Sequence, residues 1–142
     1  MVQQCLLIIA VYSNRIMRQT NMETGYTTTI AGNQTAPTGI SSDGYGLSAS
    51  FWQAGGGMAI TSDGSYALFA DFPECVIRSM DMQTRQVTTV LGVSGLSGCN
   101  HQPGNGLQAH LAYPLMLLSS DNVFGIIIEQ NTQTLTYLNL ST

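Results

Sequence analysis

Histidine and cysteine are the residues of this sequence best suited to bind a metal or to act in catalysis. The 142-residue chain has two histidines, His101 and His110, and three cysteines, Cys5, Cys75 and Cys99. A zinc site takes three or four such ligands at short spacings, commonly with C-x-x-C pairs. No C-x-x-C pair is present, and neither histidine stands at a zinc-binding spacing. We therefore expect no metal, no cofactor and no catalytic residue.

Motifs for nucleophilic catalysis and phosphate binding are also missing. The sequence has no G-x-S-x-G elbow, which would expose a nucleophilic serine. Its glycine clusters, Gly44-Tyr45-Gly46 and Gly55–Gly57, are not followed by the lysine of a phosphate-binding loop, because the chain contains no lysine.

The cysteines leave two interpretations open. Cys75 and Cys99 lie 24 positions apart, and in an oxidising compartment a disulfide between them would add about 2–4 kcal/mol to the free energy of unfolding. Two free thiols are the alternative. Cys5 lies in the apolar run Cys5–Tyr12, where we expect a small buried residue.

The composition excludes several classes of protein. Charged residues make up 8% of the chain, hydrophobic residues 44%, and the net charge is −4. A disordered chain has the opposite balance, and four cationic residues cannot form the basic surface that nucleic acids require. The run Cys5–Tyr12 is far shorter than the ~20 residues of a membrane-spanning helix. We expect no nucleic-acid partner and no membrane span.

An internal repeat organises the chain. A shift of 60 residues places Ala10–Gly32 over Ala70–Gly92 without a gap, with seven of the 23 pairs identical. The same shift aligns Gly44–Phe51 with Gly104–Leu111, and a shift of 58 lays Met58–Thr84 over Met116–Thr142. Repeats of this length indicate a fold built from stacked, similar units.

Each unit is predicted to contain short antiparallel strands. In the central unit we expect strands at Met58–Ser62, Tyr66–Phe72, Cys75–Met82 and Gln86–Leu91, separated by turn-forming clusters. No segment has helical periodicity. Four-stranded meanders repeated at this period are typical of β-propeller blades, so we predict an all-β chain. In this alignment Cys5–Val11 is the second strand of a blade and should be buried on both faces.

Three segments resemble the motifs of NHL-repeat β-propellers. Ala70–Arg78 is similar to the family's VADxxNxxIR, Val87–Gly92 to its VTTLAG, and Asp43–Phe51 to its DGxGxxAxF connector. The resemblance implies a blade motif made of Asp71, Arg78, Arg18, Asp43, Gly44 and Gly46. It implies an ion pair or turn hydrogen bonds between Asp71 and Arg78, which would staple the blade. Departures fall at Val11 and Glu129 in place of the blade Asp, at Thr136 in place of Arg78, at Ala54 in place of the usual Pro, and at Pro103 in place of Asp43.

The predicted units do not complete a propeller. Residues 1–32 form a partial blade (strands two to four), 33–56 a connector, 57–92 a complete blade, 93–114 a second connector, and 115–142 a partial blade (strands one to three). Open blades would expose apolar faces and unpaired edges. We expect further blades of the same protein, or a homo- or hetero-assembly, to cover them.

An extracellular or cell-surface location fits this sequence. Asn33-Gln34-Thr35 and Asn139-Leu140-Ser141 are acceptor tripeptides for N-glycosylation. The absence of lysine and the surplus of Ser, Thr, Asn and Gln agree with a secreted protein.

The function expected from these observations is a non-catalytic, extracellular propeller segment that acts as a structural or protein-interaction module. Trp52 either anchors a protein partner or fills the space between adjacent blades. The alternative is a fragment of a propeller enzyme, a metal-dependent lyase or a lactonase-like hydrolase, whose active site uses blades absent here.

Overall fold

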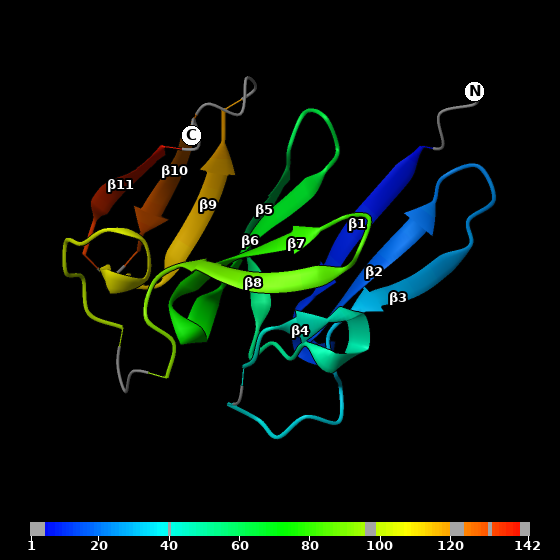
Figure 1. Cartoon of the computed structure of the whole chain (residues 1–142), viewed down its shortest axis with the longest axis horizontal. Helices are drawn as coiled ribbons and strands as arrows, with labels where there is room; N and C mark the ends of the chain where they lie inside the picture. The colour runs from blue at the N-terminus through cyan, green and yellow to red at the C-terminus, as the bar shows by residue number, and fades with distance from the viewer. Residues whose placement is uncertain (1–4, 40, 96–98, 120–123, 131, 140–142) are drawn as a thin grey trace.

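The protein consists of three antiparallel β-sheets that lie side by side (Figure 1). The computed structural model describes residues 5–39, 41–95, 99–119, 124–130 and 132–139. We call the sheets the first, central and third blade. The predicted all-β fold built from antiparallel meanders is confirmed.

The central blade contains all four predicted strands. They are β5 (Ala54–Ile60), β6 (Tyr66–Asp71), β7 (Val76–Asp81) and β8 (Gln86–Leu91), paired in sequence order. A fifth, two-residue strand, β4 (Gly44–Tyr45), pairs with the outer side of β8. Because β4 belongs to the segment before the blade, it fastens that segment along the blade's outer edge.

The outer blades have three strands each in the described residues. The first blade is formed by β1 (Leu6–Val11), β2 (Ile16–Asn21) and β3 (Thr27–Ala31). The third is formed by β9 (Pro114–Leu118), β10 (Phe124–Glu129) and β11 (Thr134–Asn139). Residues 32–53 join the first blade to the central one, and residues 92–113 join the central blade to the third. We call these segments the first and second connector.

Four one-turn 3-10 helices complete the described structure. η1 (Tyr12–Asn14) and η3 (Phe72–Glu74) follow the second strand of their blades, whereas η2 (Gly46–Ser48) and η4 (Gly106–Gln108) lie in the connectors. η1 and η3 each end at a residue in the left-handed conformation, Arg15 with φ 57° and Cys75 with φ 59°. The same turn therefore recurs at the 60-residue spacing of the repeat.

Two hydrophobic cores fill the spaces between the blades. The core between the first and central blades contains Met17, Phe51, Phe69 and Val87, and the rings of Phe51 and Phe69 meet edge to face with centroids 5.3 Å apart. The core between the central and third blades contains residues from β6, β7, the second connector and β10. The central blade is thus covered on both faces, which explains why consecutive residues Val76, Ile77 and Arg78 are all buried.

The inner strand β5 lies close to both neighbouring blades. A Cβ atom added to Gly56 would lie 2.6 Å from the carbonyl oxygen of Pro114, and one added to Gly57 would lie 2.7 Å from that of Met116. A Cβ added to Gly55 would instead meet the ring of Tyr12 at 2.9 Å. The glycine run lets three blades approach one another at this strand.

Two expectations about the first blade are wrong. Leu6, Leu7 and Ile9 on β1 are exposed by 40%, 45% and 39%, so this strand is not buried on both faces. Cys5 is also exposed. In the central blade, β5 pairs with β6 and covers its inner edge, whereas no strand among the described residues pairs with the corresponding edge of β1.

The strand bounds differ slightly from the predicted blade bounds. β5 begins at Ala54, within the predicted connector 33–56, and ends at Ile60. β9 begins at Pro114, the last residue of the predicted connector 93–114. Glycines weaken the sequence signal of a strand, and this accounts for the late start predicted for β5.

Candidate functional site

Most of the buried polar residues lie where a connector meets the blade that follows it. We call these two places the first seam and the second seam. At the first seam the carboxylate of Asp71, at the end of β6, is fully buried. It accepts hydrogen bonds from the backbone amides of Gln53 at 2.9 Å and Trp52 at 3.2 Å, and from the Ser41 hydroxyl at 2.9 Å. Asp71 therefore holds the first connector from inside the blade.

Arg78 completes the first seam. Its guanidinium is 1% exposed and lies between two carboxylates, with Nη1 at 2.7 Å from Asp43 and Nε at 3.5 Å from Asp71. Nη2 also donates to Ser41. Asp43 in turn accepts hydrogen bonds from the backbone amide and the hydroxyl of Thr89, both at 2.9 Å. The buried cation thereby links β6, β7, β8 and the connector.

The second seam has the same plan with different side chains. Glu129, at the end of β10, is fully buried and accepts a hydrogen bond from the backbone amide of Ala112 at 2.8 Å. The imidazole Nδ1 of His101 lies 2.9 and 3.0 Å from its two oxygens, and the Thr136 hydroxyl donates to it at 2.5 Å. The carboxylate again holds the connector from inside the following blade.

The two seams correspond residue by residue through the repeat. His101 stands where Ser41 stands in the first connector, and Glu129 and Thr136 stand where Asp71 and Arg78 stand in the central blade. In the first seam the buried carboxylate is thus paired with an arginine from its own blade. In the second seam it is paired with a histidine from the connector. That histidine is 29% exposed, whereas Arg78 is buried.

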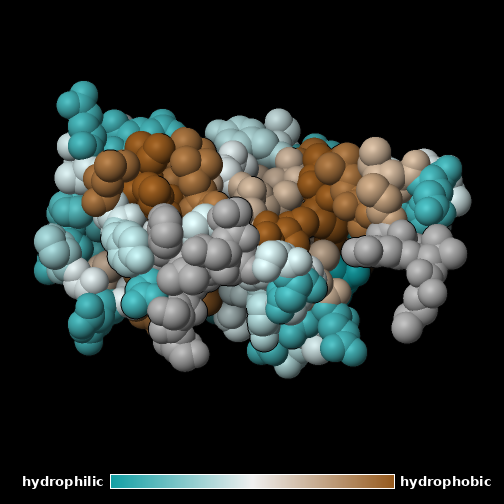
Figure 2. Space-filling view, turned by 90° about the horizontal axis from the view of Figure 1, so that it is seen from above, coloured by the Kyte–Doolittle hydropathy of each residue, from teal (hydrophilic) through white to brown (hydrophobic). Residues whose placement is uncertain are grey.

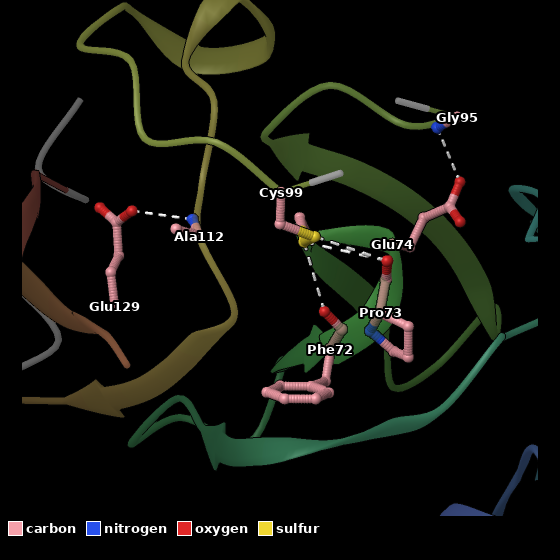
Figure 3. The surroundings of a disulfide bond; sticks show 8 residues. Phe72, Pro73, Glu74, Gly95, Cys99, Ala112 and Glu129 are labelled. Carbon is pink, nitrogen blue, oxygen red and sulfur yellow. Dashed lines mark hydrogen bonds between the residues drawn. A yellow bond between two sulfur atoms is a disulfide. The ribbon is translucent and has the colours of Figure 1, made fainter. Parts of the chain in front are cut away.

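A disulfide fixes the second connector to the turn after β6 (Figure 3). Cys75 and Cys99 are bonded with their Cα atoms 5.7 Å apart, which decides between the two interpretations of these cysteines. Beside the disulfide, the Glu74 carboxylate accepts hydrogen bonds from the Ser94 hydroxyl and from the Gly95 amide at 2.5 and 2.8 Å. The connector is therefore held by one covalent and two polar contacts.

The acidic residues at the hairpin turns are also hydrogen bonded. The Thr61 hydroxyl, and next the Ser65 amide and hydroxyl, lower the pKa of Asp63 to about 2. The amides of Thr84 and Gln83 lower the pKa of Asp81. Burial lowers the pKa of Arg85, and nearby Asp81 partly opposes the shift. These carboxylates stabilise turns and do not converge on a common site.

The side chains of the remaining predicted residues take no part in the seam hydrogen bonds described above. Arg18, the counterpart of Arg78, is exposed on β2 and pairs with Ile9. The position that corresponds to Asp71 is Val11, which has no carboxylate. Trp52 is half-buried, and its ring lies 3.8 Å from the position of a Cβ on Gly39. His110 pairs with Gln102 through the backbone of the second connector. Gly46 has φ +52°, and a Cβ on Gly44 would lie 3.0 Å from the backbone of Ser48 and Ala49.

The two glycosylation tripeptides are in different settings. Asn33 lies at the start of the first connector, where its side-chain oxygen accepts hydrogen bonds from the Thr35 amide at 2.9 Å and hydroxyl at 2.7 Å. A shallow hollow of about 260 Å³ opens beside it, lined in part by Ile16, Thr29 and Leu47. Asn139 is the last residue of β11, and Ser141 of its tripeptide lies outside the described residues.

The buried polar side chains of the two seams, together with Glu74, bind the connectors and hold them in place. The described residues contain no group of three or more His, Cys, Asp or Glu side chains placed to share a metal ion. Within the same residues, no helix is long and apolar enough to span a bilayer.

Comparisons with known proteins give structural neighbours alone. No family model and no curated protein matches the sequence. A protein of unknown function from Bacteroides thetaiotaomicron matches with a TM-score of 0.77 and 22% identity over 92% of this chain and 32% of its own. The likeness is one of fold. Auxiliary nutrient binding proteins from B. thetaiotaomicron and Bacteroides ovatus match with TM-scores of 0.67 and 0.70 and identities of 18% and 16%.

These neighbours are much longer than the chain. The chain is covered to 93% and 92% by the two nutrient binding proteins, but it spans only 35% and 34% of their lengths. It therefore corresponds to about a third of each solved structure.

Sequence reasoning missed Ser41, and it considered His101 only as a metal ligand and not as a seam residue. Both residues stand in polar connectors and match no motif. Through the repeat, His101 aligns with Ser41 and Glu129 aligns with Asp71. Most aligned positions differ in residue type, so these two differences alone do not identify the contact.

Proposed function

We propose that this chain is a non-catalytic NHL-type propeller segment that serves as an extracellular structural or protein-interaction module within a longer protein or an assembly. The proposal is supported by the contacts of the buried ionisable side chains, which hold the connectors in place. Asp71, Arg78, Glu74 and Glu129 each bind a connector or a side chain that holds one. Catalytic groups, in contrast, are expected in a cleft with room for a substrate.

The covalent structure supports the extracellular part of the proposal. Structural disulfides persist in oxidising compartments and are rare in the cytosol, and the Cys75–Cys99 bond closes a 24-residue separation between a blade and its connector. The scarcity of charge and the Asn33 tripeptide, of which Gln34 and Thr35 are exposed, agree with this location.

The open blades support the part that concerns a longer protein or an assembly. Figure 2 shows two apolar patches, one in each half of the molecule. In the first and third blades, β1 and β11 expose Leu7, Ile9, Leu135 and Tyr137. Exposed apolar area of this kind marks surfaces that other protein covers. Rigid blades with such ends suit a module that is joined to further blades.

Two variants test whether the buried carboxylates have a structural or a catalytic role. The wild-type chain, Asp71→Asn and Glu129→Gln are purified with the disulfide intact. Thermal unfolding is recorded, together with hydrolysis of lactone, ester and phosphate-ester substrates in the presence of Ca²⁺, Mn²⁺ or Zn²⁺. We expect both variants to have lower melting temperatures, because each leaves buried hydrogen-bond donors poorly matched, and we expect no turnover by the wild type. Turnover that is lost in Glu129→Gln at an unchanged melting temperature would support the propeller enzyme instead.

A further inference from the structure

The hollow at the start of the first connector is lined in part by the side chain of Asn33. Its volume is about 260 Å³, and it brings together residues of β2, β3, the start of the connector and η2. The lining residues are Ile16, Thr29, Gly32, Asn33, Gln34, Thr35 and Leu47. The hollow therefore lies between the start of the connector and a turn that comes later in the same connector.

The carboxamide of Asn33 is held in one orientation. Its Oδ1 accepts hydrogen bonds from the Thr35 amide at 2.9 Å and from the Thr35 hydroxyl at 2.7 Å. Arg15 fixes the backbone of the same segment, because it donates to the carbonyls of Gln34 at 2.8 Å and Ala36 at 2.9 Å. The side-chain oxygen is thus occupied by the protein, and Nδ2, the atom to which an N-linked sugar is bonded, is left for the sugar.

Leu47 gives the same hollow an apolar wall. Its side chain is 60% exposed, and the turn that carries it is fixed to the start of the connector by the hydrogen bond from the Gly32 amide to the Gly46 carbonyl at 3.1 Å. A pyranose ring has CH groups on its faces and hydroxyls around its rim, so it can bury one face against a leucine while its polar groups stay in water. A sugar that is tethered beside the leucine has a high effective concentration there, so a weak contact is sufficient.

The second connector has the leucine without the acceptor. Leu107 stands where Leu47 stands in the first connector and is 57% exposed. Val93, however, takes the place of Asn33, so no N-linked sugar can be attached beside Leu107. The chain thus contains a matched leucine in which the effect of a neighbouring sugar can be separated from the effect of the leucine itself.

The first connector also lacks the disulfide of the second. Arg15 and Gly39 occupy the positions of Cys75 and Cys99. A sugar that joins Asn33 to Leu47 would connect the start of the first connector to η2.

We propose that the hollow binds the first N-acetylhexosamine of a glycan on Asn33, with one face of the sugar ring packed on Leu47. The proposal rests on the extracellular location in the proposed function. The glycosyl donor is a lipid pyrophosphate-linked oligosaccharide. Nδ2 of Asn33 forms a bond to C1 of the sugar, the C1–O bond to the pyrophosphate breaks with its electron pair going to the pyrophosphate, and one amide proton is released.

The contribution of the first sugar is measured on one sequence with and without it. All samples carry Asn139→Gln, so that Asn33 lies in the remaining acceptor tripeptide. The glycosylated sample is secreted from a eukaryotic host and trimmed enzymatically to a single N-acetylglucosamine, and the sugar-free sample comes from the periplasm of a bacterial host without N-glycosylation. We expect the trimmed sample to melt about 2–4 °C higher than the sugar-free one.

Two leucine variants test where the sugar lies. In Leu47→Ala the gain from the sugar should fall below about 1 °C, whereas in Leu107→Ala the gain should be unchanged. Nuclear Overhauser contacts between the sugar ring protons and the Leu47 methyl groups should be present in the trimmed wild type.

Three results would overturn the proposal: no glycan on Asn33, no gain in melting temperature from the sugar, or the same gain in Leu47→Ala as in the wild type. The last of these would show a general effect of the sugar that does not depend on the hollow. None of the readouts uses hydrolysis of a substrate. An unglycosylated Asn33 would therefore end this proposal and leave the non-catalytic role of the buried carboxylates to its own test.

Discussion

Arg15 and Cys75 occupy equivalent positions in adjacent blades, and each holds the connector that follows its blade. Both residues end a 3-10 turn in the left-handed conformation. Arg15 donates to the carbonyls of Ala36 at 2.9 Å and Gln34 at 2.8 Å, while Cys75 is bonded to Cys99. A pair of hydrogen bonds in one repeat is thus replaced by a covalent bond in the next.

The disulfide is predicted to stabilise the chain measurably. Cys99→Ala should lower the free energy of unfolding by about 2–4 kcal/mol. Without the disulfide, the segment between Cys75 and Cys99 has more conformational freedom in the unfolded chain. Denaturant unfolding of the variant and of the wild type, each with and without a reducing agent, measures the loss. Cys5→Ala is the control, since Cys5 is exposed and unpaired. Equal stability of oxidised wild type and Cys99→Ala would contradict the prediction.

Arg78 is predicted to be essential to the first seam. Arg78→Met should cost about 3–5 kcal/mol, because it leaves the buried Asp71 carboxylate without its cation and frees Asp43. Arg18→Met is matched in residue type and repeat position, but Arg18 is exposed, so its effect should stay within about 0.5 kcal/mol. Chemical unfolding of both variants makes the comparison, and similar losses in the two would show that Arg78 is not a staple.

The close approach of β5 to β9 is predicted to exclude a side chain at Gly57. Gly57→Ala combines a positive φ of +93° with a collision against the Met116 carbonyl, whereas Gly64→Ala has a similar φ of +72° and nothing within 4 Å. The left-handed conformation costs both variants about 1–2 kcal/mol, and overpacking should cost Gly57→Ala a further 1–3 kcal/mol or so. Thermal unfolding separates the two contributions. A smaller loss in Gly57→Ala than in Gly64→Ala would be incompatible with this packing.

The turn at residues 61–66 is predicted to be acid-sensitive through Asp63. Hydrogen bonds lower the pKa of this carboxyl from 3.8 to about 2 in the folded protein. Its ionised form therefore contributes stability above pH 3.8, and that contribution is lost as the pH falls to about 2. NMR titration of the Asp63 carboxyl and the Ser65 amide should give one midpoint near the lowered value. Asp63→Asn should remove the step at Ser65, and a midpoint at 3.8 in the wild type would count against the hydrogen bonds.

Glycosylation is predicted at Asn33 when the chain is secreted from a eukaryotic host. Asn33 lies in a connector with its Thr35 exposed, whereas Asn139 is part of β11 and pairs with Phe124. Mass spectrometry of the wild type, Asn33→Gln and Asn139→Gln should show a glycan lost only in Asn33→Gln. An unglycosylated wild-type chain would remove this support for the extracellular location.

The repeat made much of the fold predictable, because pairing between neighbouring strands is encoded locally. The meander from Tyr66 to Leu91 follows from alternating turn and strand residues, and Asp71 and Arg78 were expected to interact across adjacent strands. Burial of β1 could not be predicted in this way, since it depends on what covers Leu7 and Ile9 and not on the strand's own residues. The contact between His101 and Glu129 joins positions 28 apart in the sequence. No sequence motif that contains either residue predicts it.

The unlike chemistry of the two seams makes the order of the blades matter during folding. Tandem copies of a similar sheet are prone to dock on the wrong neighbour, and hydrophobic faces alone discriminate poorly between similar copies. If the second connector packed on the central blade, Pro103 would face Arg78 where Asp43 belongs, and a buried guanidinium would lose a counter-ion. The first seam thus disfavours the second connector, so this difference between the copies guards against one wrong docking of the chain.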